Sequence, residues 1–138
     1  MDIWVRWAEL RQERNRLWSA NYCVYSYLHP NRDWLLYIGK AGGSTVRQRL
    51  SGDHKLRLFR DIRKDYGIED IRVLVGVLEL ENGRYRTDEL LADVESLLIM
   101  RLQPYGNSSA TRNRISRPSL RVHCTGDWPF KRASFRDA

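Results

Sequence analysis

Two short segments rich in β-branched and aromatic residues, separated by a polar turn, constrain the fold of this chain more than any other feature. The first covers residues 22–27 and the second residues 35–41, with a Pro-Asn pair in the turn between them. Such runs around such a turn predict an antiparallel β-hairpin. Ser44 then predicts the start of a helix, because serine is a favourable N-cap residue. Arg47 and Arg49 would lie in the first turns of that helix.

Four further segments carry secondary-structure patterns. Residues 3–18 place apolar residues, three of them tryptophans, at helical spacing. They predict an amphipathic helix that packs on a sheet, the alternative being a base-stacking or dimer surface. Residues 56–66 predict another helix, and residues 71–78 form the nearly continuous apolar run of a central strand. Thr87 predicts the N-cap of a last helix, which extends to about residue 102.

These elements predict an α/β chain of the α+β kind, in which a small central antiparallel sheet of about three strands is flanked by helices. A length of 138 residues fits a single domain. We expect an N-terminal helix within residues 1–20, a core that carries the site over residues 22–107, and a basic extension over residues 108–138. That extension is interpreted either as a solvated, partly disordered end or as a surface that contacts a phosphate backbone. Within it, residues 120–124 have the pattern of a strand, and Trp128 is suited to dock on the core.

The chain has 24 basic and 17 acidic residues, which gives a formal net charge of +7. This excess favours a polyanionic partner such as nucleic acid, although many basic proteins bind none. No apolar run approaches the roughly 18 residues of a membrane span, and the first residues do not resemble a signal peptide, so we expect a cytoplasmic protein. Cys23 and Cys124 are too few for a disulfide framework or a cysteine-based zinc site.

One carboxylate in the last expected helix has an unusual position. Glu95 lies beside the apolar stripe, four residues after Leu91 and three before Leu98. A carboxylate at the edge of a buried stripe costs free energy unless it binds a cation or accepts hydrogen bonds. The pattern alone leaves two interpretations, a structural ion pair or a metal ligand. Asp93 points to another side of the helix, so the segment offers one carboxylate to a site.

Several residues, in this order along the chain, resemble the motifs of the GIY-YIG nuclease family. Val24-Tyr25-Ser26 stands at the position of the first tripeptide, and Tyr37-Ile38-Gly39 matches the second. Glu95 is followed twelve residues later by Asn107, with a Gln-Pro pair between them, which is similar to the closing signature of the family. The closing signature is similar in particular to that of the nuclease module of the bacterial excision-repair incision subunit. The ordered set, rather than any one motif, carries the resemblance.

The resemblance implies a role for each matching residue. Tyr25 would act as general base or orient the attacking water, with Tyr37 in support. Arg49 would hold the phosphate, because a planar and permanently charged guanidinium suits that group. Glu95 would bind one divalent ion, either Mg²⁺ or Mn²⁺. Asn107 would brace the site through its side-chain amide.

Further polar residues would assist this set. Lys40 is one of the cations available to stabilise a phenolate. His54 lies one position later than the His or Tyr of many family members, and it is interpreted either as a proton acceptor or as a surface residue. Contacts with nucleic acid are expected from Arg47, Lys55, Arg57, Arg112, Arg114 and Arg117.

The resemblance therefore implies a metal-dependent DNA endonuclease that uses one metal ion and a tyrosine-activated water and leaves a 3′-hydroxyl and a 5′-phosphate. The sequence shows no separate base-reading module, so we expect low sequence specificity or selectivity for DNA structure. The alternatives are a sequence-specific restriction-type nuclease and a non-catalytic nucleic-acid-binding or repair-complex module. RNA is not excluded as a substrate. The protein would act away from membranes, as a monomer or a homodimer.

Overall fold

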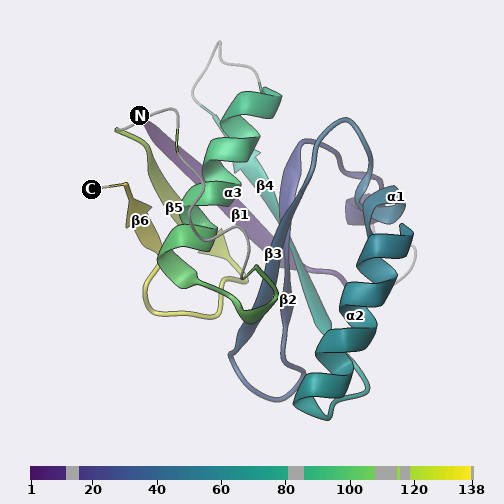
Figure 1. Ribbon diagram of the computed structural model, residues 1–138. Coiled ribbons are helices and arrows are strands. Elements are labelled where there is room, and N and C mark those ends of the chain that lie inside the picture. The colour runs from purple at the N-terminus through teal and green to yellow at the C-terminus, as the bar shows by residue number, and fades with distance from the viewer. Residues whose placement is uncertain (12–15, 81–85, 108–114, 116–118, 138) are drawn as a thin grey trace.

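The computed structural model describes residues 1–11, 16–80, 86–107, 115 and 119–137, which form a mixed α+β structure (Figure 1). Its strands are β1 (Asp2–Glu9), β2 (Cys23–Leu28), β3 (Leu35–Ala41), β4 (Arg72–Glu79), β5 (Arg121–Gly126) and β6 (Ser134–Arg136). Its α-helices are α1 (Val46–Leu50), α2 (Asp53–Tyr66) and α3 (Asp88–Leu102), and two short 3-10 helices are η1 (Arg16–Ser19) and η2 (Tyr105–Asn107).

The described strands belong to one curled, six-stranded sheet in the order β3-β2-β4-β1-β5-β6. Neighbouring strands are antiparallel except β1 and β5, which are parallel. The sheet is therefore mixed, and it is larger than the antiparallel sheet of about three strands that the sequence predicts. The additional strands come from the two ends of the chain, which meet where the Met1 amine donates a hydrogen bond to the Ser119 carbonyl at 3.0 Å.

The prediction of an N-terminal helix over residues 3–18 is wrong, because its first half is strand β1. Burial in β1 alternates, with Ile3, Val5 and Trp7 buried while Trp4 between them is 39% exposed. This period of two belongs to a strand, and tryptophans and β-branched residues favour one. Strand β1 also lies between β4 and β5, so its backbone finds hydrogen-bond partners on both sides. That pairing outweighs the apparent helical spacing.

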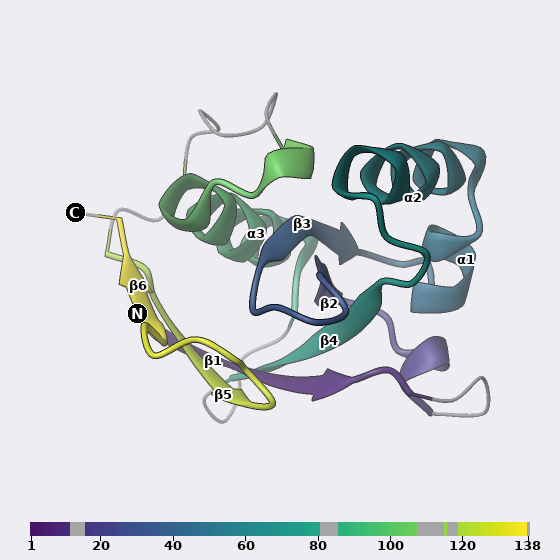
Figure 2. The ribbon, with the colours of Figure 1, turned by 90° about the horizontal axis from the view of Figure 1, so that it is seen from below.

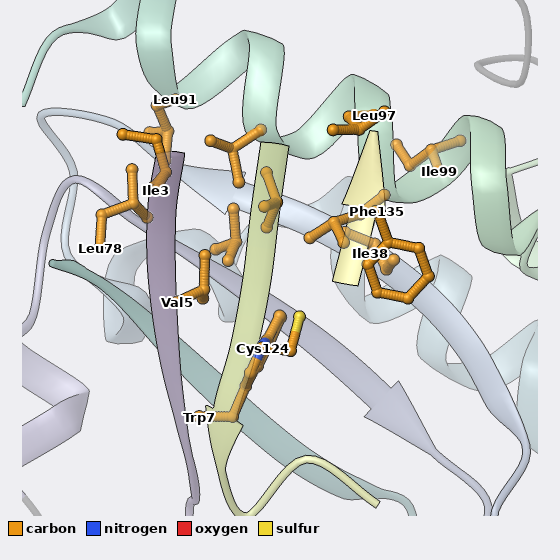
Figure 3. Packing of buried hydrophobic residues seen from close by; sticks show 14 of the residues in the cluster. Ile3, Val5, Trp7, Ile38, Leu78, Leu91, Leu97, Ile99, Cys124 and Phe135 are labelled. Atoms are coloured by element: carbon orange, nitrogen blue, oxygen red, sulfur yellow. The ribbon is translucent and has the colours of Figure 1, made fainter. Parts of the chain in front are cut away.

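Helix α3 covers one face of the sheet and closes the larger core (Figure 3). The C-terminal residues complete this core, since Phe135 of β6 is 2% exposed and Trp128 packs against Trp7 with ring centroids 5.2 Å apart. The expectations of a strand near residues 120–124 and of a docked Trp128 are confirmed. The extension is therefore partly structural, while residues 108–114 and 116–118 lie outside the described residues.

The β2–β3 hairpin separates the two long helices, with α3 on one side and α2 on the other (Figure 2). Side chains alternate along a strand, so Val24 and Leu28 of β2 pack in the core under α3, while Tyr25 and Tyr27 pack under α2. Strand β3 is at the edge of the sheet. The two helices therefore approach each other around the free edge of β3.

The remaining predictions of secondary structure are mostly confirmed. Gly67 ends α2 in the left-handed conformation with φ 62°, and Thr87 caps α3. Strand β4 is central, between β2 and β1. The N-cap of α1 is Thr45 rather than Ser44, because Thr45 forms a reciprocal capping box with Gln48. The turn expected at residues 81–83 lies outside the described part of the chain. In the part that is described, a helix with the length and apolar character to cross a membrane is not found.

Candidate active site

Three tyrosines form an aromatic cluster on the hairpin face that α2 covers. The ring centroids of Tyr25, Tyr27 and Tyr37 lie 5.4 to 6.1 Å apart. Tyr25 pairs with Gly39 across the hairpin, and a Cβ atom on Gly39 would lie only 2.5 Å from the Tyr25 ring. Glycine at position 39 therefore lets the Tyr25 ring approach the neighbouring strand closely. This packing explains why the second tripeptide ends in glycine.

The two motif tyrosines have different environments. Tyr25 is fully buried, and its hydroxyl has no hydrogen-bond partner among the described residues. Burial, together with the neighbouring Tyr37, raises the pKa of Tyr25 far above its ordinary value of 10.0. Tyr37 is 8% exposed, and its pKa is also raised, by burial and by the charge of Glu95. Tyr37 is therefore the more accessible of the two residues.

Lys55 lies inside the site rather than on the nucleic-acid-binding surface that the sequence suggests. It is only 7% exposed, and its ammonium donates a hydrogen bond to the Tyr37 hydroxyl. The Lys55 Nζ atom is 4.5 Å from the centroid of the Tyr37 ring. Burial and the nearby positive charge of Arg49 lower the pKa of Lys55 to about 8. His54, the preceding residue, is exposed.

Glu95 of α3 approaches the same site from the other side of β3. Burial raises the pKa of this half-buried carboxyl group, while the charges of Lys40, Lys55 and Arg49 act in the opposite direction. Among the residues that the structure describes, the Glu95 carboxylate forms no ion pair within 4.0 Å. One carboxylate thus lies within the electrostatic influence of three cations without being neutralised by a direct contact.

The donor set fits a divalent ion only in part. Across the described residues, no group of three or more His, Cys, Asp or Glu side chains could hold a metal ion. Glu95 supplies one carboxylate whose oxygens are not engaged in an ion pair with those residues. Mg²⁺ and Mn²⁺ accept such a site when water and substrate phosphate oxygens complete the coordination. The residues present are therefore compatible with an ion that binds together with a phosphate.

Asn107 holds the edge strand of the site. Its Oδ1 atom accepts a hydrogen bond from the Ile38 N–H at 2.8 Å, and its Nδ2 group donates one to the Ile38 carbonyl at 2.7 Å. Ile38 is the central residue of the Tyr-Ile-Gly tripeptide, and Asn107 itself is 5% exposed. The amide thus replaces a neighbouring strand for this one residue of β3. This contact provides a physical basis for the bracing role expected of Asn107.

Beside these residues is a polar hollow of about 370 Å³ at the start of α2. It is lined by Ser44, Gln48, Arg49, Gly52, Asp53, His54 and Lys55. His54 therefore borders the hollow from its exposed rim, whereas Lys55 lies at the inner side, where it reaches Tyr37. The hollow is lined by residues of α1 and α2, and Arg49 and Lys55 are the basic residues of its lining.

The other basic residues that the sequence predicts to contact nucleic acid lie in different environments. The Arg47 guanidinium lies 5.0 Å from the centroid of the Trp18 ring, which is on η1. Arg57 is exposed on α2 and is open to a partner. The remaining three, Arg112, Arg114 and Arg117, lie outside the described residues.

Sequence reasoning missed the inward position of Lys55, although a signal for it exists. Lys55 shares the helical spacing of Phe59, Ile62 and Tyr66, at intervals of four, three and four residues, so it belongs to the face of α2 that packs on the hairpin. Leu56, the expected apolar member of that face, is instead 55% exposed. The position of a residue on the helix, rather than its hydrophobicity, decided which one was buried.

The chain was compared with protein-family models, curated proteins and solved structures, and none of them matches it.

Proposed function

We propose that this protein is a metal-dependent DNA endonuclease of the GIY-YIG type that hydrolyses phosphodiester bonds. The observation that carries the proposal is the convergence of Tyr37, Lys55 and Glu95 around the edge of β3, with Arg49 and Lys40 within electrostatic reach of the carboxylate. Burial of a carboxylate that has no direct ion-pair partner opposes folding, even when cations lie nearby. Such arrangements are concentrated at functional sites. The motif residues of the resemblance belong to this same cluster.

Each residue has a role that matches a requirement of phosphodiester hydrolysis. The resemblance implies Tyr25 for orienting the attacking water, but we assign this role to Tyr37, because its side chain is the more accessible, and the support to Tyr25. Arg49 and Lys40 neutralise the negative charge that develops on the phosphoryl oxygens, for which preorganised cations are effective. Glu95 would hold the divalent ion, which when bound supplies Lewis acidity for the phosphate and the leaving oxygen. Asn107 maintains the conformation of β3 beneath these groups.

Double-stranded DNA cut with low sequence specificity is the substrate that we favour. The net charge of +7 suits a polyanion, and the exposed Arg57 lies on the same helix as Lys55. The described helices and strands form the sheet and the layers that pack on it. Among them there is no separate element that would enter a groove of the DNA. Contacts with the phosphate backbone would then dominate binding, and these carry no sequence information.

The test is incubation of the purified protein with supercoiled plasmid in Mg²⁺, in Mn²⁺ and in EDTA, alongside the variants Glu95→Gln and Glu89→Gln. Glu89 is an exposed residue in the first turn of the same helix and provides a matched control. We expect metal-dependent nicking or linearisation by the wild type and by Glu89→Gln. Loss of at least a thousandfold in rate is expected for Glu95→Gln, with DNA binding retained.

Two outcomes would contradict the proposal. Intact plasmid in every metal condition, accompanied by salt-sensitive retardation of DNA on a gel, would favour a non-catalytic binding module. Full cleavage by Glu95→Gln would show that another group performs the role assigned to this carboxylate. Discrete bands instead of a smear would indicate sequence-specific cutting.

A further inference from the structure

Lys55 is a buried amine that lacks the usual carboxylate partner. Lysine side chains are almost never fully buried unless they are paired with an acidic group. Among the residues described in the structure, Lys55 forms no ion pair within 4.0 Å, and its ammonium contacts the hydroxyl and the ring of Tyr37. The surroundings of Lys55 therefore favour the neutral amine more strongly than the surroundings of an exposed lysine do.

The groups facing Lys55 act mainly against its positive charge. Arg49 of α1 repels it, Tyr37 of β3 is uncharged in its ordinary state, and Glu95 of α3 offsets part of the repulsion. On α2 itself, Asp53 and His54 are both exposed. A lysine whose pKa is about 8 is neutral in about one molecule in ten at pH 7. An ordinary lysine is neutral in fewer than one in a thousand.

We propose that Lys55 is the proton acceptor that enables Tyr37 to activate the attacking water, an inference that rests on the proposed nuclease function. In this step, the Tyr37 hydroxyl proton moves to the Lys55 amine while a water proton moves to the Tyr37 oxygen. The water oxygen forms a bond to phosphorus, and the bond from phosphorus to the 3′ oxygen breaks. The leaving oxygen then takes a proton from solvent. Lys55 acts through Tyr37 and is in this sense a positioning residue.

The neighbouring candidates fit this role less well. Tyr25 has no exposed surface, so water reaches Tyr37 more readily. His54 is exposed, and among the described residues no hydrogen bond or ring contact joins it to Tyr25 or Tyr37. A lysine that serves only to bind phosphate needs exposure, whereas Lys55 is 93% buried. The Lys55 ammonium donates to the Tyr37 hydroxyl, and once the amine is neutral the same two atoms allow the hydroxyl to donate to Lys55 instead, which provides the path for a proton.

The closing experiment measures single-turnover and steady-state cleavage by Lys55→Met, Lys55→Arg, Tyr37→Phe and the double variant Lys55→Met/Tyr37→Phe. Lys64→Met, at an exposed position of the same helix, is the matched control and is expected to cleave like the wild type. We expect kcat to fall at least a hundredfold in both Lys55 variants, with KM within about twofold of the wild type. Arginine retains the charge but is too basic to accept a proton, so it should not restore kcat.

Three further readouts distinguish a proton acceptor from a structural residue. The rise of kcat with pH near 8 should be lost in Lys55→Met. The double variant should be no slower than the more affected single variant, since the two residues act in one step. The chain has four lysines, and the ε-carbon NMR signal that is absent in Lys55→Met should titrate near pH 8 in the wild type.

The possible failures are separable. Absence of wild-type cleavage overturns the proposed function and the role of Lys55 together. Wild-type activity with normal kcat in Lys55→Met, or with a raised KM as its main defect, overturns the inference alone. Restoration of kcat to within tenfold by arginine would do the same, because charge rather than proton transfer would then be sufficient. A measured Lys55 pKa near 10.5 would also overturn the inference, because too little of the amine would then be neutral to accept a proton.

Discussion

The two faces of the β2–β3 hairpin are covered by different helices and have different chemistry. On the α3 side, the hairpin contributes aliphatic residues such as Val24, Leu28 and Ile38 to a fully buried apolar core. On the α2 side, it presents three tyrosines, and a buried lysine contacts one of them. One hairpin therefore serves both stability and the candidate chemistry, because alternate residues of a strand face opposite sides.

The two faces also have opposite effects on the stability of the fold. Apolar burial on the α3 side is favourable, whereas burial opposes the charged forms of Lys55 and Glu95 at the edge of β3. For Glu95, the raised pKa means that its contribution to stability is present at low pH and is lost as the pH rises through the folded-state pKa. Ionisable groups whose burial reduces stability are concentrated at functional sites, and Lys55, one of these two, also lines the polar hollow.

The largest stability effect should come from the α3 side. Leu98 of α3 has no exposed surface, so Leu98→Ala should lower the free energy of unfolding by about 2–5 kcal/mol through lost burial and the resulting cavity. Urea denaturation provides the measurement. Leu56→Ala is the matched control, because Leu56 on α2 is 55% exposed and should change stability by less than about 0.5 kcal/mol. Equal losses in the two variants would contradict the assignment of faces.

An effect of somewhat smaller size should appear as a pH dependence on the α2 side. The pKa of Lys55 is about 8 in the folded chain and has an ordinary value of 10.5. Between these pH values the unfolded chain binds more protons at this site, so the Lys55 contribution makes the protein more stable as pH rises. The full contribution is about 3 kcal/mol. Below pH 8, burial of the charged amine is a constant cost.

The measurement is the difference in unfolding free energy between wild type and Lys55→Met from pH 7 to pH 10. Taking the difference removes contributions from the buried Cys23 and Cys124, whose pKa values are raised to about 11 and about 12. The variant should be at least as stable as the wild type at pH 7, and the two should converge as pH rises. A difference that does not vary with pH would contradict the assignment of a charged, buried lysine.

The smallest of these effects should come from the brace at the sheet edge. Asn107→Ala removes both hydrogen bonds to Ile38 and leaves two buried backbone groups unpaired, which should cost about 1–3 kcal/mol. Hydrogen exchange of the Ile38 amide should accelerate more than exchange of amides in β1. Unchanged exchange at Ile38 in the alanine variant would argue against the brace.

Local signals in the sequence were sufficient for much of the fold. The Gly67 C-cap, the Thr87 N-cap and the apolar run of β4 predicted elements correctly, because each depends on interactions within a few residues. The N-terminal segment was misassigned because its partners, β4 and β5, are distant along the chain. The six-stranded order, with β1 parallel to β5, likewise depends on pairing between the two ends.

The candidate site divides in the same way. The identities and order of the tyrosines, Arg49, Glu95 and Asn107 were visible in the chain, and they led to the nuclease proposal. In the structure Lys55 is buried against Tyr37 and His54 is exposed, because consecutive residues of α2 point in different directions from the helix axis. The structure also left Tyr37 more accessible than Tyr25. Local residue types can identify the chemistry available to a chain, but burial and proton affinity arise only when distant segments pack together.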